Sequence, residues 1–100
     1  MKFSFHPEAR FELAQTVEYY QIMGQPLGVE FLEEVFNTIL RITEFPKAFP
    51  KLSPNTRKCL VNRFPFAVIY QARQNEIFIV AITHLSRKPG YWKERGDSIR

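Results

Sequence analysis

The chain has 100 residues, of which 45% are hydrophobic and 24% charged, with a single cysteine and a formal net charge of +4. This length predicts one globular domain over residues 1–100, and one cysteine excludes an internal disulfide. The apolar runs are far shorter than the roughly 18 residues of a membrane-spanning helix, so we expect no membrane partner. Because residues 1–7 lack the apolar core of a signal peptide, we expect a cytoplasmic protein.

The two halves of the chain differ in charge. Residues 1–46 carry three Lys or Arg and seven Glu, whereas residues 47–100 carry eleven Lys or Arg and three acidic residues. Clustered Lys and Arg raise the local concentration of phosphates and carboxylates. The basic second half therefore predicts a polyanionic or acidic partner.

The first half predicts one strand and two helices. Alternating aromatic and polar residues predict a short strand at residues 3–5, which ends before Pro7. Apolar residues at helical spacing predict amphipathic helices over 7–23, with Glu12 among the polar residues between them, and over 27–45. A Gly-Gln-Pro sequence separates the helices, which we expect to form a hairpin. The side chain before the first helix, His6, is expected to cap it.

The second half predicts strands. Three prolines in residues 45–55 block both helix and sheet pairing, so we expect a structured loop there. Residues 58–62, 66–72 and 76–84 are rich in β-branched and aromatic residues, which favour strands. The turns between these strands are short and force antiparallel pairing. The basic tail, residues 85–100, shows no clear period.

The element order is β-α-α-β-β-β, which predicts an α+β fold. We expect the two-helix hairpin to pack on one face of a four-stranded, mostly antiparallel sheet. The last two strands are apolar on both sides, so the second face of the sheet should also be partly covered. An exposed apolar face rimmed by basic residues is a place where a partner segment would dock.

The sequence indicates no metal and no cofactor. Its two histidines are far apart, Cys59 has no second thiol nearby, and there is no phosphate-binding loop or dinucleotide fingerprint. Cys59 falls among apolar strand residues and is expected to be buried. We expect Trp92 to hold the tail on the sheet, because a single large aromatic in a small domain is usually buried.

The segment after the last predicted strand contains the residues best suited to chemistry. Cleavage of an RNA phosphodiester through its own 2′-hydroxyl needs a base, an acid and cations on the developing charge. His84, Arg87 and Tyr91 are the candidate catalytic residues, with Arg87 as the phosphate clamp because its planar fork binds two oxygens. The candidate residues for binding nucleic acid or another target are the basic ones on either side of a shared groove: Arg57, Lys58, Arg63, Lys88 and Arg95.

A series of short motifs runs in order through nearly the whole chain. They are His6-Pro7-Glu8-Ala9, Tyr19-Tyr20, Gly28, Phe31-Leu32-Glu33-Glu34-Val35, Phe45-Pro46, Arg63-Phe64-Pro65-Phe66, and His84 with Arg87-Lys88-Pro89-Gly90-Tyr91-Trp92. Together they resemble the RelE/ParE superfamily of toxins from bacterial type II toxin–antitoxin modules. The resemblance implies the same β-α-α-β-β-β fold, a cognate antitoxin that wraps the toxin, a bacterial cytoplasmic setting and a role in plasmid stabilisation.

The resemblance leaves two cellular targets open. RelE-like members cut mRNA on the ribosome with basic residues on the meander strands and an Arg and a Tyr after the last strand, whereas ParE-like members inhibit DNA gyrase. Lys58, Arg87 and Tyr91 stand at RelE-like positions, but Leu60 and Ala67 stand where RelE-like members carry a second Lys and a phosphate-binding Arg. We expect ribosome-dependent mRNA cleavage by a metal-independent endoribonuclease. Gyrase inhibition is the first alternative, and a non-toxic nucleic-acid-binding or protein-interaction module is the second.

Overall fold

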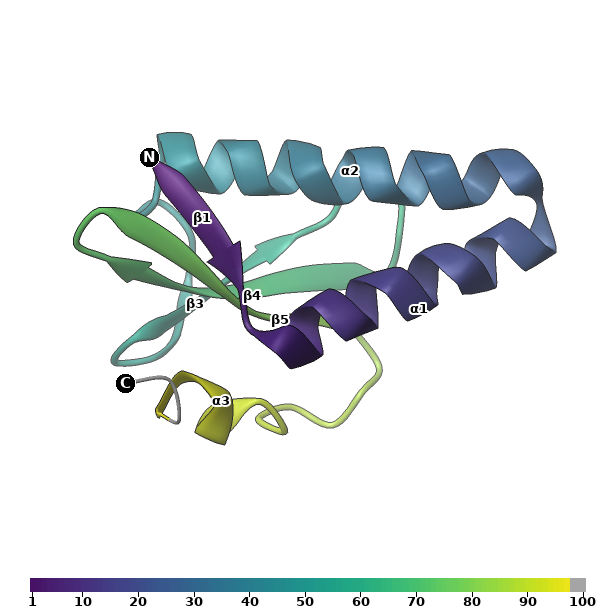
Figure 1. Cartoon of the computed structure of the whole chain (residues 1–100). Coiled ribbons are helices and arrows are strands. Elements are labelled where there is room, and N and C mark those ends of the chain that lie inside the picture. Colours follow the sequence, from purple (N-terminus) through teal and green to yellow (C-terminus); the bar gives the residue numbers. More distant parts are fainter. Residues whose placement is uncertain (98–100) are drawn as a thin grey trace.

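The computed structural model describes residues 1–97. In chain order its elements are β1 (Lys2–Phe5), α1 (Pro7–Met23), α2 (Gln25–Glu44), β2 (Lys51–Ser53), β3 (Thr56–Leu60), β4 (Phe66–Arg73), β5 (Glu76–His84) and α3 (Lys93–Asp97). The strands form one sheet in the order β1-β5-β4-β3-β2, in which β1 runs parallel to β5 and the other neighbours are antiparallel. The α1–α2 hairpin covers one face of the sheet and α3 lies on the other side (Figure 1). The predicted α+β fold is confirmed, with five strands instead of four.

The two additional elements are short. Strand β2 lies within the proline-rich segment between Pro50 and Pro54, and it pairs with β3 through Lys51 opposite Arg57 and Ser53 opposite Thr56. Because β2 pairs with it, β3 begins at Thr56, two residues earlier than predicted. Helix α3 falls in the tail for which no regular structure was expected.

Helix α1 begins where its capping residues predict. The Nδ1 atom of His6 accepts a hydrogen bond of 3.0 Å from the backbone N–H of Glu8, which confirms the predicted cap. Pro7 occupies the first turn, where no backbone donor is needed. The helix ends at Met23, and Gly24 then connects it to α2.

The helix hairpin depends on a close approach at Gly28. A Cβ atom there would lie 2.9 Å from the carbonyl oxygen of Val17 and 2.3 Å from Cγ of Gln21. Glycine therefore lets the first turn of α2 pack directly against the backbone of α1. The hairpin extends well beyond the sheet, as Figure 1 shows.

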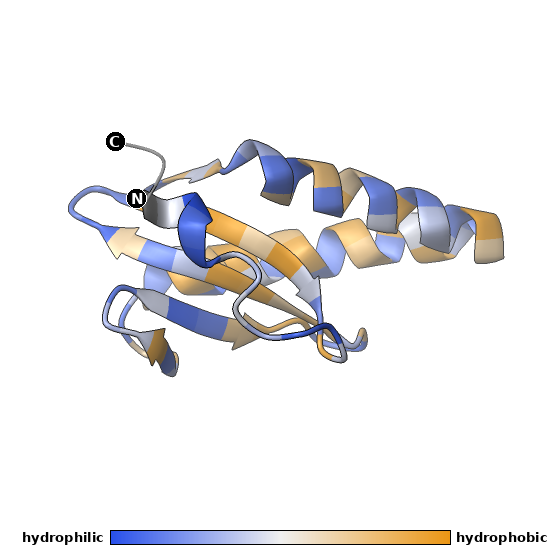
Figure 2. Cartoon of the chain, turned by 90° about the horizontal axis from the view of Figure 1, so that it is seen from below, coloured by the Kyte–Doolittle hydropathy of each residue, from blue (hydrophilic) through white to orange (hydrophobic). Residues whose placement is uncertain are grey.

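The main core lies between the helices and the sheet. Helix α2 buries Phe31, Val35 and Ile39 completely, whereas Leu32 is 36% exposed. The Phe31 ring packs at 5.0–5.3 Å against the rings of Tyr20, Phe64 and Phe66. Figure 2 shows hydrophobic residues running along the central strands of the sheet.

A second, smaller cluster occupies the opposite face of the sheet. Its buried members are Ala67, Ile69, Phe78, Val80, Ala81 and Trp92. Trp92 reaches this cluster from the segment after β5, which confirms both its predicted burial and the partial cover of the second face. None of the helices described here has the length and apolar character needed to cross a membrane.

Candidate functional site

The candidate site is a groove on the sheet face that carries Trp92. It consists of two adjoining cavities of about 100 and 390 Å³, which share Leu52, Pro89 and Trp92. Ala67 and Ile69 lie in its floor, the turn between β2 and β3 forms one wall, and the segment after β5 forms the other. We call this feature the groove.

Three of the eight predicted site residues line the smaller cavity together. Lys58 approaches it from β3, His84 from the end of β5, and Arg87 from the following turn. Lys58 faces the groove because alternate side chains of a strand point to opposite faces, and the neighbouring Cys59 belongs to the helix-side core. Lys88 is exposed beside Arg87.

Arg57 and Arg63, which were predicted to border the groove, are directed elsewhere. Arg57 donates from Nη1 to the carbonyl oxygens of Lys47 at 3.2 Å and Phe49 at 2.8 Å, so it ties the loop before β2 to β3. Arg63 adopts a φ of 71° in the turn before β4 and forms a 2.9 Å ion pair with Glu30 of α2. The predicted shared groove of both basic sets is therefore wrong for these two arginines.

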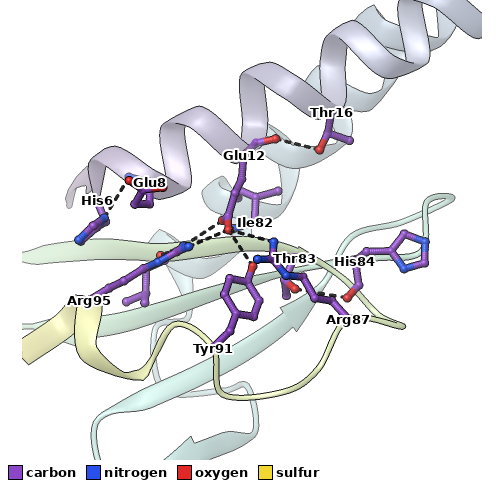
Figure 3. Close-up of polar contacts among 11 residues, drawn as sticks. His6, Glu8, Glu12, Thr16, Ile82, Thr83, His84, Arg87, Tyr91 and Arg95 are labelled. Atoms are coloured by element: carbon purple, nitrogen blue, oxygen red, sulfur yellow. Dashed lines mark hydrogen bonds and ion pairs between the residues drawn. The ribbon is translucent and has the colours of Figure 1, made fainter.

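The segment after β5 is held on the molecule by one carboxylate, Glu12 of α1 (Figure 3). Its Oε2 atom accepts hydrogen bonds from the Tyr91 hydroxyl at 2.8 Å and from Nη2 of Arg95 at 2.9 Å. Its Oε1 atom accepts from Nη1 of Arg95 and from the backbone N–H of Ile82, both at 3.0 Å. Glu12 thus turns toward the sheet, although its place in the helical pattern predicted an outward position.

The backbone of β5 explains why this carboxylate is needed. Strand β1 ends opposite Ile79, so the remainder of β5 has no strand on that side. A register shift near Tyr70 also leaves Val80 without a direct partner on β4. The N–H of Ile82 is satisfied by Glu12, and the carbonyl oxygen of Val80 accepts a 3.0 Å hydrogen bond from Arg95. The pair therefore completes hydrogen bonding along an otherwise open strand edge.

Arg95 is consequently part of the interior and does not present its charge to a target. Its side chain is only 15% exposed. Burial is the largest single influence and by itself lowers the pKa of Arg95, but the hydrogen bonds to Glu12 and the negative charge of Glu12, with smaller contributions from Tyr91 and Glu8, together raise it. The guanidinium stays charged and paired, so the prediction that Arg95 binds a target is not supported by its position.

Tyr91 is similarly engaged. Its ring lies between two guanidiniums, with Cζ of Arg87 at 3.7 Å and Cζ of Arg95 at 5.0 Å from the ring centroid. Burial, together with the hydrogen bond to Glu12, raises the pKa of Tyr91. The neutral phenol directs its proton at Glu12, so neither a free acid nor a stacking surface faces the groove.

His84 is placed to donate a hydrogen bond and not to act as a base. Its Nδ1 atom accepts a 3.0 Å hydrogen bond from the backbone N–H of Ser86 and contacts the Ser86 hydroxyl at 2.8 Å. An acceptor Nδ1 places the proton of the neutral ring on Nε2. The ring is further fixed edge-on against Phe66, at 5.0 Å between centroids.

Of the two arginines that face Glu12, Arg87 is the one that can still bind a ligand. Its side chain is 53% exposed, and its Nη1 atom lies 3.6 Å from Oε2 of Glu12, a carboxylate that already accepts four shorter hydrogen bonds. The single negative charge of Glu12 cannot neutralise both Arg87 and Arg95, so this group of three side chains has a net positive charge. Stacking on Tyr91 holds the guanidinium in place, so Arg87 is a preorganised site for a carboxylate or a phosphate.

The remaining candidates for chemistry are structural. Cys59 is buried, and burial raises the pKa of its thiol, so it behaves as a core residue, as predicted. In the described part of the chain, no three His, Cys, Asp or Glu residues are placed to hold a metal ion. Glu12 is the important residue that sequence reasoning missed, since nothing in its local pattern indicates partners some 80 residues away.

No family model matches the chain, and no curated protein does. Among solved structures, it is similar to a chain described as the chromosomal ParDE TA system from P. aeruginosa, with a TM-score of 0.74 and 17% sequence identity. The match covers 86% of this chain and 97% of that one. This chain has the fold of that toxin–antitoxin protein. The resemblance to RelE/ParE toxins is thereby confirmed at the level of the fold.

Proposed function

We propose that this protein is the toxin of a type II toxin–antitoxin module and that it inhibits growth by binding DNA gyrase. The ParDE chain with the same fold supports the toxin and a cognate antitoxin partner. The observation that carries the choice of target is the pairing of Leu60 with Ala67. These two residues lie on the face of the sheet where RelE-like enzymes carry cations.

The other candidate groups point in the same direction. A metal-free ribonuclease needs a proton acceptor, a proton donor and several cations around the phosphate. In this chain the Tyr91 proton is directed at Glu12, Nδ1 of His84 already accepts a hydrogen bond, and Arg95 is buried in an ion pair. Inhibition by binding needs none of these groups in a free state.

One observation favours the second candidate, mRNA cleavage on the ribosome. Lys58, His84 and Arg87 line a single small cavity, which is suited to hold one phosphate. Cleavage with this set would depend on two cations and a histidine donor without a separate base. Each missing oxyanion contact costs about 3–4 kcal/mol of transition-state stabilisation, so we rank this function second.

The experiment is a short induction of the chain alone in a bacterium, with growth, plasmid supercoiling and mRNA ends measured together. We expect growth arrest, relaxation of a reporter plasmid on a chloroquine gel, and no new codon-specific cuts by primer extension. Growth arrest with new mRNA cuts and unchanged plasmid supercoiling would reverse the order of the two targets. Normal growth at confirmed expression of folded protein would favour the non-toxic interaction module.

A further inference from the structure

The groove is unusual in its charge. Lys58, His84 and Arg87 stand at one end, and Lys93 stands at the other. Of the side chains that the structure describes, none that lines the groove is acidic. An occupant must therefore carry negative charge at two separated points or lose favourable interactions with one end.

The middle of the groove is apolar. Its floor is made by Ala67, Ile69 and Val80 beside Trp92. Leu52 and Leu85 line the groove from the β2–β3 wall and from the segment after β5, although they are 43% and 51% exposed. Exposed leucines around an apolar floor indicate a place for an apolar side chain of a partner.

These features fit a peptide better than RNA. Recognition of single-stranded RNA relies on exposed aromatic faces on which bases stack. Here Trp92 is 8% exposed and the Tyr91 ring lies between two guanidiniums. Along β4 the floor runs from Ala67 to Gln71, roughly 13 Å at about 3.3 Å per residue, which is the length of about four residues of extended chain.

We propose that the groove binds an extended segment of the toxin's protein target, with an acidic residue near each end and an apolar residue between them. One carboxylate would pair with Arg87 and Lys58, and the other with Lys93. The apolar side chain would lie on Ala67 and Ile69. The assignment to the target, as opposed to another protein, rests on the proposed function.

The first test needs no knowledge of the target. A display library of random 12-residue peptides is selected on the full-length protein, and the enriched peptides are measured against K58E, K93E and the double variant K58E/K93E. We expect acidic residues on both sides of an apolar one. Binding should weaken at least tenfold in each single variant and further in the double variant.

The matched control is K47E, which reverses an exposed lysine outside the groove and should change peptide affinity less than twofold. Absence of enriched peptides, a consensus without acidic residues, or equal binding to K58E/K93E would overturn the proposal. Displacement of the peptide by a U12 oligonucleotide at lower concentration than unlabelled peptide would also overturn it in favour of RNA.

The second test identifies the source of the segment. The best peptide is added to a gyrase supercoiling assay inhibited by the wild-type protein, and we expect it to restore supercoiling. A peptide that binds the groove but leaves inhibition unchanged would overturn the assignment to the target. Failure of the wild-type protein to inhibit gyrase would instead overturn the proposed function, while the peptide selection still decides the chemistry of the groove.

Discussion

Glu12 connects the first helix to the segment that carries the candidate site. Its side chain is 11% exposed and receives hydrogen bonds from Tyr91, Arg95 and the backbone of β5. A carboxylate so far removed from water is stable only while these partners remain. Arg87 owes its fixed position to the same arrangement, because it stacks on the Tyr91 ring that Glu12 holds.

Replacement of Glu12 by alanine should therefore be strongly destabilising. We expect E12A to lower the free energy of unfolding by about 3–5 kcal/mol, because the Arg95 charge stays buried without its partner. Urea unfolding followed by circular dichroism measures this directly. The control is E18A at an exposed position of the same helix, which should change stability by less than about 0.5 kcal/mol.

A double variant separates charge from packing. In E12A/R95A no unpaired charge is left, so the loss should be smaller than the sum of the two single losses. Equal stability of E12A and E18A, or strict additivity of E12A and R95A, would contradict the role given to Glu12.

Ionisation of Tyr70 should make the stability of the fold depend on pH in the alkaline range. Its side chain is fully buried and donates a 2.8 Å hydrogen bond to the carbonyl oxygen of Pro46. Burial raises the pKa of Tyr70 to about 12, so the folded protein holds this proton above pH 10, where the unfolded chain releases it. Stability should be unaffected by this group below pH 10 and fall as pH rises from 10 toward 12.

Urea midpoints between pH 8 and about 11.5 measure this loss, which reaches at most about 3 kcal/mol because each pKa unit is worth 1.36 kcal/mol. Y70F lacks the titrating proton and should show a shallower alkaline decline than the wild type. The same decline in both proteins would assign it to other groups.

The sequence predicted part of the arrangement around the groove. The structure brings three of the predicted candidates, Lys58, His84 and Arg87, together around one cavity. Each of the three could be predicted from its local sequence, because it lies in a strand of basic character, at the end of the last strand or in the basic segment that follows. The prediction that Arg63 borders the groove was wrong. Arg63 has a left-handed φ and its side chain pairs with Glu30 of α2, and the local sequence does not predict that backbone conformation. Glu12 was missed because its function arises only from tertiary contacts.

The long helices and strands were predicted well, and so were the short strands β1 and β3, whereas β2 and α3 were not predicted. Helices α1 and α2 carry enough residues for a helical period to show, and strands β4 and β5 are long enough for their β-branched and aromatic content to show. Strand β2 and helix α3 have three and five residues, and each depends on the surface it packs against. Such elements have little intrinsic stability, so their sequences contain little signal.

The helix hairpin yields a prediction with an internal control. G28A should destabilise the protein by about 1–2 kcal/mol, because the new methyl group would press on the Val17 carbonyl and overpacking outweighs the better helix propensity of alanine. G24A should be nearly neutral, since its Cβ would meet Leu27 at 3.5 Å, an ordinary contact, and its φ of 179° suits any residue.

Thermal unfolding of both variants beside the wild type measures the difference. A larger loss in G24A than in G28A would show that the hairpin turn, and not the helix crossing, limits stability.

The acidic and basic halves of the chain form different layers of the molecule. The acidic first half of the sequence forms β1 and the helix layer, while the basic second half forms most of the sheet and the groove. Figure 1 shows the α1–α2 hairpin on one face of the sheet. The groove lies on the opposite face, because its floor residues Ala67 and Ile69 belong to the cluster on that side. Association through this face should be fast at low salt and slow as ionic strength rises.

As proposed, the protein binds gyrase through the end of the groove at Arg87. The most direct measurement is supercoiling by purified gyrase with wild-type protein, R87A and the control K47A. We expect inhibition by wild type and K47A and at least tenfold weaker inhibition by R87A, whose stability should stay within about 1 kcal/mol because the side chain is half exposed. Full supercoiling in the presence of folded wild-type protein would contradict gyrase inhibition, and equal inhibition by folded R87A would contradict binding through Arg87.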